Sequence, residues 1–155
     1  RGGGQTGIRL VTSGGPTDNT SAWIFFNTFA ALDVGFTSDD IVLVEAYYNI
    51  FAHIDGTAVV GGASTSVVHN LYWDNFVNGV TGSMPVYGDP HLVNVNTGDF
   101  HIAFPSAAID LAPSGLGTPS EDIDMQARPF GMSVTPYDLG ADELKLDIFI
   151  PILFK

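Results

Sequence analysis

Two aspartates, Asp33 and Asp55, are spaced so that their carboxylates could lie side by side. Each follows an asparagine of a sequence repeat by six positions, so strands paired in register would bring them to about 5 Å. Two carboxylates at that distance could share a Ca²⁺ ion or act as a glycosidase pair. The other interpretation is a pair of turn residues, because Asp55-Gly56 is a common turn dipeptide. We favour the turn interpretation, because the third repeat supplies no matching aspartate.

A second acidic group lies towards the C-terminus, around Arg128, which is the only arginine after Arg9. We predict that Arg128 bridges one or two of these carboxylates, with Asp138 and Asp142 as its partners, and fixes a closing loop. The alternative is a Ca²⁺ site, for which Asp122 and Asp124 are the candidate ligands. The acidic group consists of Asp122, Asp124, Asp138, Asp142 and Glu143.

Other residue types give little sign of catalysis. The four histidines, at positions 53, 69, 91 and 101, show no His-x-His or other ligand spacing, and no Gly-x-Ser-x-Gly motif is present. Without cysteine there is neither a disulfide framework nor a thiolate metal site. We therefore expect no catalytic residues and no metal or cofactor other than a candidate Ca²⁺. Aromatic residues could form a sugar-stacking surface, although stacked columns are the preferred interpretation: Trp23, Tyr47, Tyr48, Tyr72 and Trp73.

Composition limits the class of partner. The chain has 155 residues, 45% of them hydrophobic, and a net charge of −12. Nucleic acid and anionic membrane surfaces are disfavoured because both need clustered Lys and Arg. The longest apolar stretch, Ile148 to Phe154, is much shorter than the roughly 20 residues of a membrane span.

The elements that must position these residues come from a repeat of the form Asn-x-aromatic. It begins at Asn27, Asn49 and Asn70, at spacings of 22 and 21 residues. A unit this short cannot bury its own apolar face and must stack on its neighbours. Stacked units would place the three asparagines in one column, where each amide can donate to the next and bond turn backbone groups. Independent turn asparagines are the alternative, and an antiparallel sandwich is the competing fold.

We predict an all-β fold, a short parallel β-helix of about three rungs with an asparagine ladder. A single domain covers residues 1–143, with a Gly-rich N-terminal segment at 1–21, rungs at 22–80 and a loop-rich closing region at 81–143. Residues 144–155 alternate between apolar and other residues, which predicts a long terminal strand with one apolar face. That face consists of Leu144, Leu146, Ile148, Ile150, Ile152 and Phe154.

The closing region resembles a known family. It contains GDPHLV at 88–93, GDFHI at 98–102, SAAID at 106–110, DID at 122–124, RP at 128–129 and DLGADE at 138–143. This string resembles the C-terminal end of secreted bacterial right-handed parallel β-helix proteins of the pectate-lyase-like superfamily, more narrowly the choice-of-anchor Q group. Met125 stands where those proteins often have Gly. The resemblance implies a right-handed coil and an extracellular or cell-surface location in a bacterium, but it implies no activity.

A stack of three rungs has two open ends, and each exposes unpaired backbone groups that invite another strand or subunit. We therefore expect a non-catalytic extracellular structural protein that assembles with copies of itself, in which residues 144–155 add to a neighbour's sheet. That terminal strand could instead pack back on its own domain. Two other functions stay open: a fragment of a polysaccharide lyase or glycoside hydrolase, and a carbohydrate-binding or adhesive module for cell-surface polysaccharide.

Overall fold

The computed structural model describes residues 4–11, 20–39, 42–115, 117–129 and 136–145. Within these ranges the chain is all-β apart from one short 3-10 helix, η1 (Val95–Thr97). No helix in the same part of the chain is long and apolar enough to cross a membrane. The predicted all-β class is confirmed.

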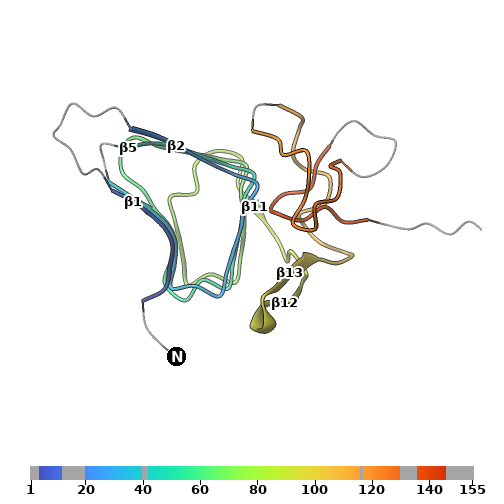
Figure 1. The fold of residues 1–155 in the computed structure, drawn as a ribbon. Helices are drawn as coiled ribbons and strands as arrows, with labels where there is room; N and C mark the ends of the chain where they lie inside the picture. Colours follow the sequence, from blue (N-terminus) through green and yellow to red (C-terminus); the bar gives the residue numbers. More distant parts are fainter. Residues whose placement is uncertain (1–3, 12–19, 40–41, 116, 130–135, 146–155) are drawn as a thin grey trace, which may run out of the picture.

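Three parallel sheets make up the N-terminal part (Figure 1). The β1 sheet has the order β1 (Thr6–Leu10), β4 (Val34–Ser38), β7 (Thr57–Val60) and β10 (Val77–Gly79). The β2 sheet has the order β2 (Thr20–Phe25), β5 (Val42–Tyr47) and β8 (Thr65–Val68). The β3 sheet has the order β3 (Thr28–Ala30), β6 (Ile50–Ala52), β9 (Leu71–Trp73) and β11 (Val86–Tyr87).

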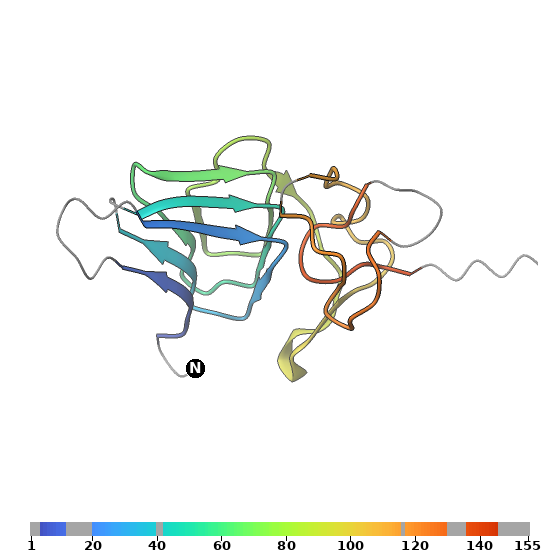
Figure 2. The same cartoon turned by 45° about the horizontal axis from the view of Figure 1, so that its top comes forward.

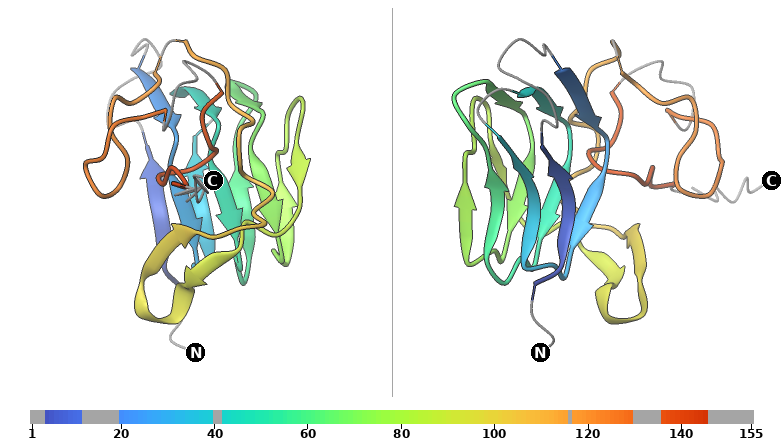
Figure 3. Two further views of the ribbon diagram at one scale, coloured as in Figure 1. Left: turned by 90° about the vertical axis from the view of Figure 1, so that its right-hand side faces the viewer. Right: turned by 60° about the vertical axis from the view of Figure 1, so that its left-hand side comes forward.

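Consecutive strands visit the three sheets in turn, so the chain coils and returns to each sheet one layer further along (Figures 2 and 3). Ile24 pairs with Ala46 and Ala46 with Val67. Each of these residues lies three positions before a repeat asparagine, so this register stacks the three asparagines as predicted. The parallel sheets are consistent with a β-solenoid. The antiparallel sandwich is wrong, because the ladders of all three sheets are parallel.

Parallel pairing extends beyond the predicted rung region of 22–80 at both ends. β1 pairs with β4, and β11 pairs with β9. The sequence gives little warning of β1, because it carries no Asn-x-aromatic unit and follows a Gly-rich start. Its alternation nevertheless turns Ile8 and Leu10 towards the buried core. Gly7 is required there, because a Cβ would lie 2.6 Å from the carbonyl oxygen of Gly35.

Aromatic rings stack inside the coil. Phe29 and Phe51 lie 4.9 Å apart at an interplanar angle of 4°, and Phe51 and Tyr72 lie 5.4 Å apart at 12°. All three rings are buried, and the register pairs Phe29 with Phe51 and Phe51 with Tyr72. Burying one such side chain stabilises the fold by roughly 1.5–3 kcal/mol. Tyr72 thus belongs to a stacked aromatic column, the interpretation that the sequence analysis preferred to a sugar-binding surface.

The closing region packs against the outside of the β3 sheet (Figure 1). Ile50 and Leu71 project from that sheet into a second core, which contains Ala108 and Leu139 of the closing region. The sheet is therefore buried on both faces. An antiparallel hairpin, β12 (Leu92–Asn94) and β13 (Asp99–Ile102), projects beside it.

Candidate functional site

The three repeat asparagines form a hydrogen-bonded column. The backbone N–H and side-chain amide of Asn49 both donate to Oδ1 of Asn70, at 2.7 and 2.9 Å. Asn27 donates to Oδ1 of Asn49 in the same two ways, at 2.9 and 3.2 Å. The two buried amides also donate to carbonyls near the ends of strands, that of Ile24 in β2 from Asn49 and that of Ala46 in β5 from Asn70. Asn49 and Asn70 are fully buried, so the column stabilises the stack rather than presenting chemistry.

Asn75 plays the same part in another turn, and the sequence analysis missed it. Its Oδ1 accepts the backbone N–H of Ile54 at 3.0 Å, and its Nδ2 donates to the carbonyl of Phe51 at 2.9 Å. Asn70 makes the equivalent pair of bonds, to the N–H of Asn49 and the carbonyl of Ala46. Asn75 stands where earlier coils carry apolar residues, so no repeated column marked it.

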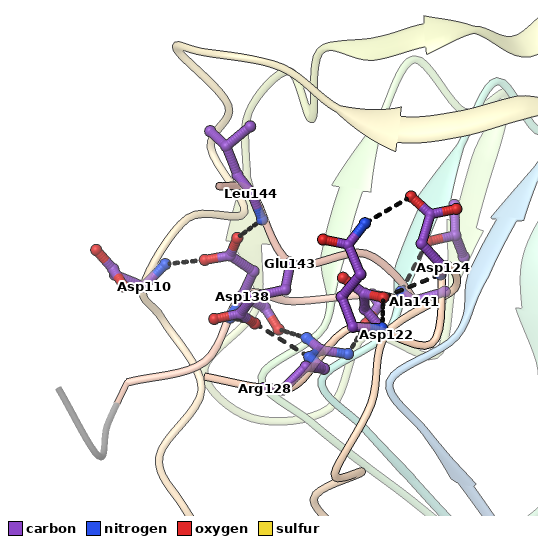
Figure 4. A network of polar contacts seen from close by, with 11 residues as sticks. Asp110, Asp122, Asp124, Arg128, Asp138, Ala141, Glu143 and Leu144 are labelled. Carbon is purple, nitrogen blue, oxygen red and sulfur yellow. Dashed lines mark hydrogen bonds and ion pairs between the residues drawn. The ribbon is translucent and has the colours of Figure 1, made fainter. Parts of the chain in front are cut away.

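Arg128 is buried and joins separate parts of the closing region (Figure 4). Its Nε donates to Oε2 of Glu143 at 3.0 Å, while its two terminal nitrogens donate to the backbone carbonyls of Gly140 and Asp138. Its guanidinium also lies 5.0 Å from the ring centre of Phe26. The residue therefore fixes the closing region and holds it on the end of β2.

The predicted pairing of Arg128 with the carboxylates of Asp138 and Asp142 needs correction. The ion pair is made with Glu143, and Asp138 contributes its backbone carbonyl. The Asp138 carboxylate accepts the N–H groups of Asp110 and Leu144, each at 2.7 Å. The Asp142 carboxylate accepts the N–H of Ile102 at 2.8 Å. Backbone donors reach both aspartates because the loop folds around them, which the linear sequence does not reveal.

Burial shifts the titration of both aspartates. Removal from water raises the pKa of Asp138 to about 6, against the opposing effect of its two backbone hydrogen bonds. Burial also raises the pKa of Asp142, and its bond to Ile102 works in the other direction. Raised carboxylate pKa values are common at functional sites. Here both groups hold backbone N–H donors inside a folded loop, which is a structural role.

The candidate calcium ligands Asp122 and Asp124 belong to a tight turn. Oδ1 of Asp122 accepts the N–H groups of Asp124 and Gln126 at 2.9 and 2.8 Å. Oδ2 of Asp124 contacts Nε2 of His101 at 3.0 Å and accepts Nε2 of Gln126 at 3.2 Å. Met125 within this turn has a φ of 61°, in the left-handed region that favours glycine.

Asp33 and Asp55 line one cavity of about 470 Å³, together with His53 and with Val95 and Asn96 of the β12–β13 hairpin. Oδ2 of Asp33 accepts the backbone N–H groups of Gly4 and Gln5, at 2.6 and 2.7 Å. Asp33 thus holds the start of β1 in place. For Asp33 this contact is structural.

His53 lies at the centre of a longer groove, which we call the His53 groove. Its Nδ1 is 2.8 Å from Oδ2 of Asp74, and both side chains are exposed. A second cavity, of about 680 Å³, is lined by His53, Asp55 and Asp74, and a third, of about 450 Å³, by His53, Trp73 and His91. Turn residues of the solenoid and the β12–β13 hairpin therefore border a largely polar groove of three cavities that share His53, with two aromatic side chains, Trp73 and Phe76.

Metal binding finds no ready group of ligands in the described ranges. No three His, Asp or Glu side chains there converge in an arrangement that could hold a metal ion. The sets predicted for Ca²⁺, Asp33 with Asp55 and Asp122 with Asp124, lie on separate turns, and the structure brings neither set into a larger ligand cluster.

The last coil of the stack, residues 65–87, carries large apolar side chains in contact with solvent. We call it the terminal coil. β8, β10 and β11 are the last strands of their sheets in the part of the chain that the structure describes. An isolated bridge between Val68 and Ser83 covers part of the β8 edge. The exposed side chains are Phe76 (82%), Met84 (64%), Tyr87 (63%), Val77 (44%) and Trp73 (37%).

Most of the predicted assembly strand lies outside the described residues. Leu144 packs at the margin of the second core, where its backbone N–H donates to Asp138. Leu146, Ile148, Ile150, Ile152 and Phe154 fall in the range that the structure does not describe.

Comparison with known proteins adds no identity. Neither a protein-family model, nor a curated protein, nor a solved structure matches the chain. Nothing therefore identifies it as a pectate-lyase-like or choice-of-anchor Q protein, and that resemblance stays a prediction from the sequence.

Proposed function

We propose that this protein is a non-catalytic extracellular structural protein that assembles with copies of itself through the ends of its β-solenoid. The observation that carries the proposal is the terminal coil, where edge strands and exposed apolar side chains occur together. Unpaired strand edges accept further strands, and soluble proteins rarely leave large apolar side chains clustered in water. The extracellular location rests on the family resemblance alone.

The two ends of the stack are suited to each other. β1, β2 and β3 are the first described strands of the same three sheets that end in β10, β8 and β11. A second copy stacked on the terminal coil could continue all three sheets at the usual strand spacing of about 4.8 Å. Such a contact is head-to-tail, so it extends into a filament unless it closes into a ring. The alternating apolar pattern of residues 144–155 predicts a further strand for this assembly.

Size-exclusion chromatography with light scattering, together with electron microscopy of the purified protein, tests the proposal. We expect assemblies larger than a monomer. The double substitution Phe76→Ser with Val77→Ser should reduce them, because it removes the two neighbouring apolar groups beside the β10 edge.

The matched control is Phe104→Ser with Val93→Ser. These residues are of the same types and are similarly exposed, at 71% and 54%, but they lie in the closing region. The control should assemble like the unmodified protein. A monomer at all concentrations, or equal loss of assembly in both double variants, would rule out assembly through the terminal coil.

A carbohydrate-binding module is the second candidate, and the His53 groove favours it. Carboxylates and imidazoles bind hydroxyl groups, and the groove includes Trp73, whose ring could stack on a sugar. If it binds glycans, Trp73→Ala should abolish retention on a glycan array. Trp23→Ala, which removes a more exposed ring on the β2 strand, should leave it unchanged. A polysaccharide-degrading fragment is less favoured, because Asp33 already holds two backbone N–H groups.

A further inference from the structure

His101, on strand β13, contacts a carboxylate through each of its ring nitrogens. Nδ1 lies 2.6 Å from Oδ1 of Asp99, and Nε2 lies 3.0 Å from Oδ2 of Asp124. A carboxylate oxygen accepts hydrogen bonds, so both nitrogens must carry a proton for both bonds to exist. Neutral histidine has only one N–H. The observed geometry is therefore that of the positively charged imidazolium.

The two contacts join segments that are distant in sequence. Asp99 and His101 belong to the hairpin, whereas Asp124 belongs to the turn at 122–126. The next residue, Ile102, donates its N–H to Asp142, and Ile123 donates its N–H to the carbonyl of Ala141. The hairpin and the turn are thus each tied to residues 141–142, and His101 links them directly to each other.

The surroundings of His101 are mostly acidic. A cavity of about 200 Å³ separates the turn from the end of the closing region, and His101 lines it. Asp99 faces the ring from its own strand. The other titratable or charged groups around that cavity are Asp122, Asp124, Asp142, Glu143 and Lys145. The carboxylates outnumber the single lysine, and their field favours the protonated ring.

We propose that His101 is a pH-sensitive clasp, which fastens the β12–β13 hairpin to the turn at 122–126 while the ring is charged and releases the turn when it loses a proton. The His101 side chain is 38% exposed, so it can exchange protons with solvent. Release leaves Ile102 buried and bonded to Asp142, so the base of the hairpin stays in place. The neutral ring keeps one N–H, which serves the shorter bond to Asp99, so the bond to Asp124 is lost. Ile123 stays bonded to Ala141, so the release is confined to the Asp124 side of the turn, beside the cavity that Leu144 and Lys145 also line.

The direction of titration agrees with this geometry. The hydrogen bond to Asp99 is the largest cause that raises the pKa of His101 above 6.5. Burial opposes it, and the bond to Asp124 raises the pKa further by a smaller amount. A raised folded-state pKa means that the clasp contributes its full stability below pH 6.5 and loses it as the pH rises through the higher folded-state pKa. The bond to His101 also lowers the pKa of Asp99, which keeps that carboxylate charged in mildly acidic solution.

An NMR titration of the full chain between pH 5 and 9 tests the clasp. The imidazole resonances of His101 and the backbone amides of Asp124 and Gln126 should shift with one common midpoint, above 6.5. In the Asp124→Asn variant the His101 midpoint should fall, because a negative charge has been removed. The turn amides should then no longer follow it.

Asp74→Asn is the control, because it removes the carboxylate from the other short His–Asp contact, that of His53. It should leave the His101 midpoint unchanged. The clasp is overturned if His101 titrates at or below 6.5 in the unmodified protein, or if the turn amides titrate independently of it. An unchanged His101 midpoint in the Asp124→Asn variant also overturns the clasp. The first two tests need only the unmodified protein, so they hold even if the variant does not fold.

Discussion

The asparagine ladder makes a sharp prediction about one side chain, because Asn49 lies at its centre and Asn27 at its end. Replacing Asn49 with Ala removes an Oδ1 that accepts two bonds from Asn27 and an Nδ2 that donates to Ile24 and Asn70. Asn49 is fully buried and Ile24 is nearly so, whereas Asn27 is partly exposed. Water therefore cannot replace the lost partner of the Ile24 carbonyl.

The magnitude follows from the groups left without a partner. The carbonyl of Ile24 and the backbone N–H of Asn27 lose the side-chain partners that Asn49 provides. Each buried polar group without a partner costs about 1–3 kcal/mol. The Ile24 carbonyl bears that full cost and the partly exposed N–H of Asn27 about 0.5–1.5 kcal/mol, so we expect Asn49→Ala to lower the free energy of unfolding by about 2–4 kcal/mol.

Asn27→Ala should have a much smaller effect. Its side chain donates to the carbonyl of Phe25 and to Oδ1 of Asn49. In the variant, Oδ1 of Asn49 still accepts the backbone N–H of residue 27. Asn27 is partly exposed, so water can reach the freed groups. A neutral hydrogen bond contributes about 0.5–1.5 kcal/mol net, and we expect a loss of about 1 kcal/mol.

Equilibrium unfolding in guanidinium chloride, followed by tryptophan fluorescence, measures both variants. Asn49→Leu separates hydrogen bonding from packing, because Leu fills a similar volume without an amide. It should be nearly as unstable as Asn49→Ala. Equal losses in Asn27→Ala and Asn49→Ala, or recovery of stability in Asn49→Leu, would refute the reasoning that the ladder stabilises the stack by hydrogen bonding.

Four further predictions concern the closing region and the second turn. Arg128→Met and Glu143→Met should each lower the free energy of unfolding by about 3–5 kcal/mol, because each leaves a buried charge without its partner. In a double-mutant cycle the double variant should lose clearly less than the sum of the two single losses, and additive losses would contradict the buried ion pair. Asp138 has a folded-state pKa raised to about 6, so its contribution is full below pH 3.8 and is lost as the pH rises through 6. The free energy of unfolding should fall by about 2–3 kcal/mol between pH 4 and 7, and Asp138→Asn should remove most of this pH dependence. If the variant keeps the same pH dependence, another group is responsible for it. Gly140→Ala should speed amide hydrogen exchange across the closing region, because φ at this position is +86° and a Cβ would come within 2.7 Å of side chains of β3 and β6. Unaltered exchange would show that the neighbouring side chains move aside without loss of stability. Asn75→Ala should lower the unfolding free energy by about 1–3 kcal/mol in denaturant, and no loss would exclude it from the turn's hydrogen bonding.

Much of the solenoid could be predicted because its period appears as a repeat in the amino-acid sequence. Asn27, Asn49 and Asn70 recur at one spacing with aromatic residues beside them, and strands in register must then stack like residues. β1 was missed because its five residues carry no repeat unit, and only contact with β4 and the core makes them a strand. Asn75 was missed because it occurs once, so no column identified it.

The candidate sites depended more heavily on the tertiary structure. The acidic residues near Arg128 were recognisable as a group, but their partners were not. Glu143 pairs with Arg128, while Asp138 and Asp142 accept backbone N–H groups from residues 28 and 40 positions away. His101 had no ligand spacing in the sequence, and its contact with Asp124 spans 23 residues.

By itself the sequence determined an all-β chain of stacked parallel strands with an asparagine column, because a short repeat leaves its apolar face open until it meets the next copy. It also indicated that Arg128 pairs with a carboxylate of the closing region. Only the tertiary structure decided where the closing region lies, on the outer face of the β3 sheet, and which carboxylate meets which donor. The physical reason is that periodic contacts are local in the repeat, whereas loop contacts depend on how distant segments pack around a second core.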